Sequence, residues 1–171
     1  MTKKTISIFC AVAILLVSVP ALYANTDSEV GFHGFSWGTS IEEFTRRMGT
    51  PAHTDEVSGL QSLVYDGLIV SGYPAFMVAY FSGNGLEGGT YYFHTHTLEE
   101  LMKCYTDVQR ELFERFGPTM LADGIIREMR PYETAWDLAN GYVYLNVNTR
   151  LNEPVSLWFS SPYLTRLLMG S

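Results

Sequence analysis

The chain has 171 residues, of which 18 are acidic and 11 are basic, giving a net charge of −7. Such an acidic chain is repelled by phosphate backbones and by anionic membrane surfaces, so we expect no nucleic-acid partner. Aromatic residues make up 14% of the sequence and can supply a packed core.

Residues 1–24 have the layout of a cleavable secretory signal peptide. Two lysines precede an apolar run from Ile6 to Val19, and small residues follow it, with cleavage expected after Ala24 or Ala21. The run is shorter than the roughly 20 residues that a membrane-spanning helix needs. We therefore expect a periplasmic or secreted protein with no stable membrane insertion after cleavage.

Cleavage after residue 24 leaves residues 25–171, which are long enough for a single domain. The two lysines of the signal leave with it, so the net charge falls from −7 to −9. Of the two cysteines, Cys10 also leaves and Cys104 remains, so no intramolecular disulfide can form. The stability of the mature domain must then come from packing.

Two helices are predicted from the same pattern of start and stop signals. Ser40 with Glu43, and Thr97 with Glu100, form capping boxes in which a hydroxyl and a carboxylate bond free backbone amides. A glycine followed by a proline ends each segment. Apolar side chains recur at helical spacing at Ile41, Phe44 and Met48, and again at Leu98, Leu101, Tyr105, Val108, Leu112 and Phe116. We expect a short first helix and a long core helix over residues 97–116, with Cys104 beside its apolar stripe.

The remaining segments predict strands and turns. A short strand is expected over residues 31–38, before the first helix, and a short helix over residues 163–168 closes the chain. The glycines at 83, 85, 88 and 89 are interpreted as hairpin turns, and Asn140-Gly141 as a tight two-residue turn. Further strands are predicted at residues 62–65, 68–70, 75–81, 89–94, 125–129, 134–138, 142–148 and 155–159.

This order predicts an α+β fold in which an antiparallel sheet packs on the long helix. Residues 32–96 and 97–171 share the sequence of a helix followed by strands, which suggests a degenerate internal duplication. Identity between the halves is low, so independent convergence on the same local signals is the alternative.

Residues 34–44, Gly-Phe-Ser-Trp-Gly-Thr-Ser-Ile-Glu-Glu-Phe, resemble the opening of a group of small secreted bacterial α+β domains of unknown function. The aromatic segments Tyr80-Phe81 and Tyr91-Tyr92-Phe93 continue that resemblance. The layout is also distantly similar to the outer-membrane assembly lipoprotein and β-lactamase-inhibitor folds, which implies a protein-binding role. The chain lacks the lipidated cysteine and the disulfides of those folds, and the resemblance supplies no catalytic residue.

His94 and His96 form the one metal-like spacing in the sequence. Alternate residues of a strand point the same way, so both imidazoles could hold a cation with a carboxylate from Glu99 or Glu100. The alternative is that both histidines are solvated at the end of a strand. The two glutamates also favour the positive end of a helix, which accounts for them without catalysis.

Cys104 could act as a thiol nucleophile only with one of the four histidines as its base. It lies inside a helix and not at a helix N-terminus, so a buried core role is favoured. The sequence contains no motif for a cofactor, and none is expected.

The alternation of aromatic residues in the predicted strands is the most informative pattern for function. If the aliphatic sides pack on the helices, Tyr92, Tyr142, Tyr144, Asn146 and Trp158 share the opposite sheet face. Tyrosine and tryptophan among small polar groups are typical of recognition surfaces. A helix, a loop or a second copy covering this face is the alternative.

The sequence thus predicts a non-enzymatic exported module that binds a protein or an envelope component. One alternative is a small metal-binding protein or metal-dependent hydrolase using His94 and His96. A structural homo-oligomer is the other.

Overall fold

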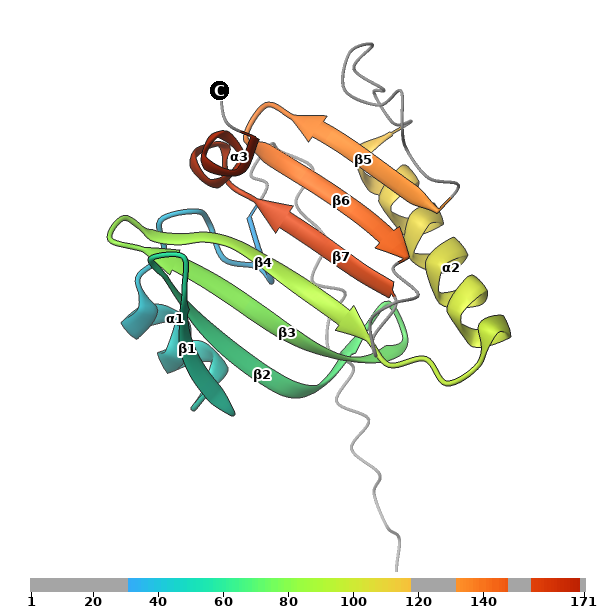
Figure 1. The fold of residues 1–171 in the computed structure, drawn as a ribbon, viewed down its shortest axis with the longest axis horizontal. Helices are drawn as coiled ribbons and strands as arrows, with labels where there is room; N and C mark the ends of the chain where they lie inside the picture. The colour runs from blue at the N-terminus through green and yellow to red at the C-terminus, as the bar shows by residue number, and fades with distance from the viewer. Residues whose placement is uncertain (1–30, 118–131, 148–154, 170–171) are drawn as a thin grey trace, which may run out of the picture.

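A computed structural model describes residues 31–117, 132–147 and 155–169. Seven antiparallel strands form one sheet, with three helices, in the predicted α+β class (Figure 1). The predicted signal peptide and the predicted strand at residues 125–129 lie outside the described residues. The elements in chain order are α1 (Ile41–Met48), β1 (His53–Val57), β2 (Leu60–Val70), β3 (Tyr73–Ser82), β4 (Gly85–Phe93), α2 (Leu98–Phe116), β5 (Glu133–Leu138), β6 (Gly141–Val147), β7 (Val155–Ser160) and α3 (Pro162–Met169).

The sheet has the strand order β1-β2-β3-β4-β7-β6-β5. Each half is a helix followed by an antiparallel meander, and the last strands of the halves, β4 and β7, pair at the centre. The predicted order of both halves is therefore present, while a duplication remains a hypothesis.

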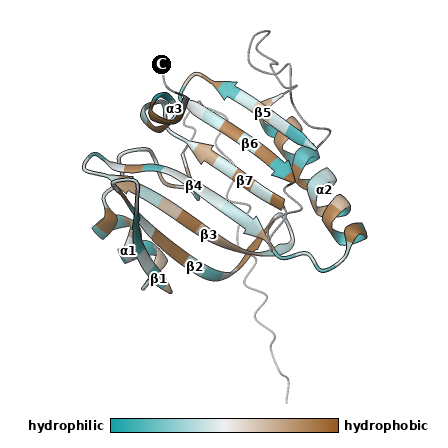
Figure 2. Cartoon of the chain, in the orientation of Figure 1, coloured by the Kyte–Doolittle hydropathy of each residue, from teal (hydrophilic) through white to brown (hydrophobic). Residues whose placement is uncertain are grey.

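The main core lies between α1, α2 and one face of the sheet. Phe44 of α1 is fully buried against Phe35, Tyr65 and Phe81, with ring centroids 4.3–6.0 Å apart. On α2, four of the predicted stripe residues are buried with Cys104: Leu101, Tyr105, Val108 and Leu112. Figure 1 shows α1 beside the β1–β2 side of the sheet and α2 beside the β5–β6 side, and Figure 2 shows apolar residues gathered in β2, β3 and α3.

Both helix starts have the predicted hydroxyl caps. Ser40 accepts a hydrogen bond from Glu43 N–H at 3.2 Å, and Thr97 accepts one from Glu100 N–H at 3.1 Å. The Glu100 carboxylate accepts from the His96 N–H and not from the N-cap residue. Leu98, predicted on the core face, is the first residue of α2 and is 72% exposed.

The strand predicted over residues 31–38 is wrong. His33 and Gly34 both have positive φ, at 53° and 76°, and reverse the chain in two residues. Phe32 and Phe35 exchange both backbone hydrogen bonds across this turn, and both rings are buried. The apolar alternation that predicted a strand therefore forms a tight turn held by two core rings.

Three other features of the strands differ from the sequence-based expectation. Residues 62–65 and 68–70 belong to the single strand β2, with a register shift between Tyr65 and Leu68. Strand β1 was not predicted, since its residues 53–57 are mostly polar. The two-residue connection between β5 and β6 is Ala139-Asn140, one residue earlier than expected.

Gly88 and Gly89 are not turn residues but lie within β4. A Cβ atom at Gly89 would lie 2.1 Å from the Phe32 ring, on the core side. At Gly88, a Cβ would lie 2.6 Å from Cδ2 of Leu164 in α3. Because adjacent residues point to opposite faces, the two glycines admit Phe32 on one side of the sheet and α3 on the other.

A buried carboxylate fixes the start of α3. Glu87, which is 5% exposed, accepts hydrogen bonds from the hydroxyls of Ser82 at 2.9 Å and Ser161 at 2.5 Å. Ser161 also caps α3 by accepting from Leu164 N–H. These bonds link the β3–β4 hairpin to the helix.

A polar cluster joins α2 to the start of β3. Asp107 accepts hydrogen bonds from Lys103 and Tyr73, each at 2.6 Å, and from Arg110 at 2.8 Å. The hydrogen bond from Lys103 is the largest of the effects that lower the pKa of Asp107 from 3.8 to about 2.

Candidate functional site: an aromatic sheet face

The five residues predicted to share a sheet face do so. In the register, Tyr92 lies opposite Ser156, which lies opposite Asn146, and Trp158 lies opposite Tyr144. Directly opposed residues of antiparallel strands point to the same side of the sheet. Tyr142 is two residues from Tyr144 and points the same way. We call this side of the sheet, away from α1 and α2, the open face.

The first half of the sheet adds two aromatic residues that the sequence analysis does not assign to this face. Phe76 stacks on Tyr92 with centroids 4.8 Å apart, and Tyr80 stacks on Trp158 at 5.5 Å. The interplanar angles are 16° and 24°. Both pairs join rings of different strands, so the face is a continuous aromatic surface over β3, β4, β7 and β6. The strict alternation of β3 was the signal that could have identified Phe76 and Tyr80.

The open face is only partly exposed. All of its aromatic side chains are half-buried, because neighbouring rings cover their flat sides. Burial raises the pKa of Tyr80, and nearby Tyr92 adds to this effect. Burial also raises the pKa of Tyr142. Tyr80 and Tyr142 therefore remain neutral phenols at ordinary pH.

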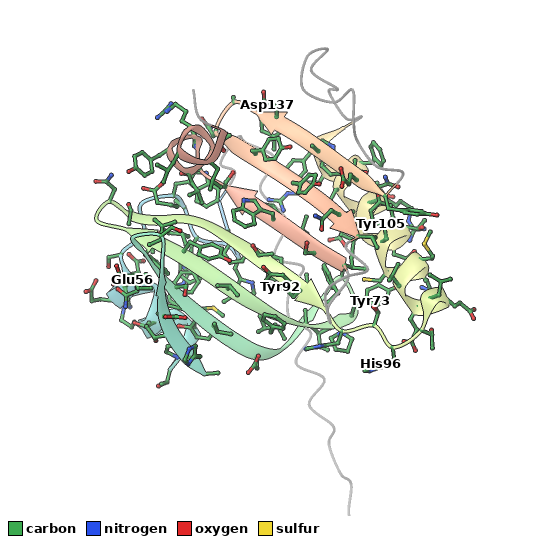
Figure 3. The ribbon with its side chains drawn as sticks, in the orientation of Figure 1. Glu56, Tyr73, Tyr92, His96, Tyr105 and Asp137 are labelled. Carbon is green, nitrogen blue, oxygen red and sulfur yellow. The ribbon has the colours of Figure 1, made fainter. Side chains whose placement is uncertain are left out.

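Of the described helices, α3 is the one that packs on the open face. Its Leu164 is buried over Gly88, and Ser160 Oγ lies 2.8 Å from Thr165 Oγ1. A cleft of about 220 Å³ lies between α3 and the part of the open face that carries Tyr142 and Tyr144. Its lining consists of Tyr142, Tyr144, Trp158, Ser160, Thr165 and Leu168. The rest of the face, over β3 and β4, has no described helix on it (Figure 3 labels Tyr92 there).

Acidic side chains border the open face along the edge strand β5. Asp137 lies opposite Tyr142, and Glu133 lies opposite Asn146, so both carboxylates are on the same side as the aromatic rings. Figure 3 shows Asp137 at that edge of the sheet.

The two histidines of the metal hypothesis are exposed. His94 follows β4, where its ring centroid is 5.8 Å from that of Phe76, and His96 lies just before α2. Within the described ranges, no group of three or more His, Cys, Asp or Glu residues is arranged to hold a metal ion. The metal hypothesis therefore has no third ligand among the residues described.

Cys104 lies in the core with its side chain fully buried. Burial raises the pKa of its thiol to about 12, so the thiolate needed for nucleophilic attack is not formed near neutral pH. His33, one of the histidines considered as a base for Cys104, has its Nδ1 2.7 Å from the hydroxyl of Tyr91. The favoured interpretation of Cys104 as a core residue agrees with this placement.

Among the described helices, none combines the length and apolar character needed to span a bilayer.

No protein-family model matches the sequence, and no curated protein matches it. Three solved bacterial structures resemble the fold at low identity. An extracellular protein with an SCP domain from Bacillus anthracis has a TM-score of 0.42 and 10% identity over 75% of this chain. A cysteine-rich secretory protein from Staphylococcus aureus has a TM-score of 0.45 and 11% identity over 73% of this chain.

The third is a DUF4309 family protein from Bacillus subtilis, with a TM-score of 0.44 and 8% identity over 71% of this chain and 78% of its own. The alignment spans only 44% and 43% of the first two structures.

Proposed function

We propose that this chain is an exported, non-enzymatic module that binds a protein of the cell envelope through its open face. The single observation that carries the proposal is the aromatic surface formed by Phe76, Tyr80, Tyr92, Tyr142, Tyr144 and Trp158 on one side of the sheet. The signal-peptide layout of residues 1–24 supports export.

The chemistry of the face supports binding. Tyrosine and tryptophan give large contact areas with few rotatable bonds, and they dominate the energy of protein interfaces. The hydroxyls and amides between them, such as Ser156 and Asn146, can bond a partner's polar groups. The stacked pairs are already formed, so little conformational entropy is lost when a partner binds.

The double variant Tyr144→Ala/Trp158→Ala tests this function. It removes two rings that face each other across β6 and β7. We expect the variant to keep the circular dichroism spectrum of the wild type and to lose capture of its partner from envelope extracts. The matched control Leu98→Ala/Tyr132→Ala removes exposed apolar side chains, 72% and 43% exposed, from other parts of the molecule and should keep capture.

Two results count against the proposal. Unfolding of the double variant would mean that these rings belong to a core. Equal capture by wild type and variant would place the binding surface elsewhere. Light scattering on the same samples tests the homo-oligomer alternative, in which the wild type is a stable dimer and the double variant a monomer.

A further inference from the structure

The cleft under α3 has the size and lining of a pocket for one side chain. Its volume of about 220 Å³ is below the roughly 300–1,000 Å³ of pockets that enclose a small-molecule ligand. Three aromatic residues of the sheet line it together with Leu168 of α3, which is 61% exposed. Among the lining residues, the hydroxyls of Ser160 and Thr165 lie 2.8 Å apart and bond each other. Most of the lining is therefore apolar.

The electrostatic surroundings of the cleft favour a positive charge. Asp137 lies directly opposite Tyr142 on the same side of the sheet, which places a carboxylate one strand from the lining. Leu168 belongs to the last turn of α3, and the C-terminal end of a helix carries a partial negative charge. The faces of the tyrosine and tryptophan rings also attract cations.

Arg166, the basic residue of α3, does not place its positive charge at the cleft. Leu164, Thr165 and Leu168 face the sheet or the cleft, and they span about 100° of the helix surface. Arg166 lies roughly 150° from the middle of that arc and is exposed, so its side chain leaves the helix on the side away from the cleft.

We infer that the cleft binds a basic side chain, lysine or arginine, of the protein partner that occupies the open face. The apolar stem of such a side chain packs between Leu168 and the aromatic rings, and its charged end reaches the Asp137 edge. This inference rests on the proposed function and adds to it the partner side chain that the cleft binds. Charge complementarity with a mature domain of net charge −9 supports a basic partner.

Side-chain analogues test the inference on the intact protein. The probes are n-butylammonium for lysine and n-propylguanidinium for arginine, and n-pentanol is the neutral control. Binding is followed through the indole N–H resonance of Trp158, with the buried indole of Trp136 as an internal reference. We expect the cations to shift the Trp158 resonance and to bind about fivefold more tightly than n-pentanol.

Two variants locate the effect. Asp137→Asn should weaken binding of both cations by about two- to fivefold and leave n-pentanol unchanged. Tyr144→Leu should weaken all three probes, because it removes a wall of the cleft. Tyr132→Leu is the matched control, at a 43% exposed tyrosine outside both the open face and the cleft lining, and it should leave all three affinities unchanged.

Equal affinity for the cations and n-pentanol would overturn the inference, as would no shift with any probe up to about 50 mM. Failure here is separable from failure of the proposed function. If Asp137→Asn keeps full partner capture while Tyr144→Ala/Trp158→Ala loses it, the open face binds the partner but the basic anchor is wrong.

Discussion

Leu164 of α3 packs directly on the Cα of Gly88 in β4, so closely that a methyl group at Gly88 would lie 2.6 Å from Leu164 Cδ2. The same methyl group would lie 2.9 Å from the backbone oxygen of Phe159 in β7. A glycine is therefore required at position 88 for α3 to pack on the sheet. Thr165 and Leu168 of the packed α3 in turn line the cleft.

Gly88→Ala should destabilise the domain by about 1–3 kcal/mol, since either α3 or β7 must move to relieve the overlap. Urea denaturation measures the change in the free energy of unfolding. Gly83→Ala is the control, because nothing lies within 4 Å of a Cβ at Gly83. Equal stability of the two variants would show that α3 is not packed on Gly88 in solution.

Neighbouring residues of β6 should respond differently to truncation. Leu145 is fully buried in the core, whereas Tyr144 lies half-buried on the open face. Leu145→Ala should lower the free energy of unfolding by about 2–5 kcal/mol, and Tyr144→Ala by clearly less. Thermal denaturation of both variants checks this order. A larger loss for Tyr144→Ala would mean that the face is covered in the folded protein.

The Asp107 cluster predicts a specific dependence of stability on pH. The pKa of Asp107 falls from 3.8 to about 2 on folding, so the stability it contributes is fully present above pH 3.8 and is lost as pH falls through about 2. Asp107→Asn should therefore melt below the wild type at pH 7, and the two melting temperatures should converge between pH 3.8 and 2. A difference that stays constant down to pH 2 would contradict the assigned hydrogen bonds.

Cys104 should be protected from alkylation in the folded protein. Its thiol is fully buried and its pKa is raised to about 12, so at pH 8 it is both inaccessible and neutral. N-Ethylmaleimide should modify it only in urea, as followed by peptide mass spectrometry that counts Cys10 separately. Rapid labelling of Cys104 without urea would place it outside the core.

Local signals in the sequence predicted several elements correctly. Ser40 and Thr97 mark the two helix starts. Each hydroxyl accepts a hydrogen bond from the backbone N–H three residues later, so the signal is local and can be recognised in the sequence. Alternation along β6 and β7 predicted which side chains share a face, since that periodicity does not depend on the neighbouring strand. The sequence alone therefore predicts that Tyr144 and Trp158 share a face.

Features that depend on distant contacts were missed. The sequence predicts a turn at Gly88 and Gly89, because nothing nearby in the chain indicates that Phe32 and Leu164 pack on them. Strand β1 is mostly polar and lies at the sheet edge, where no apolar alternation is needed. The sequence also does not predict the cleft, since its lining combines residues of β6 and β7 with residues of α3.

Photo-crosslinking from the middle of the open face in living cells tests directly whether this face binds an envelope protein. Val78 lies between Val64 and Thr90 in the register, and p-benzoyl-phenylalanine can replace it. The matched control carries the same residue at exposed Glu114 of α2. We expect a crosslink to one envelope protein from position 78 and none to that protein from position 114. A crosslink only to a second copy of the chain, or the same products from both positions, would contradict it.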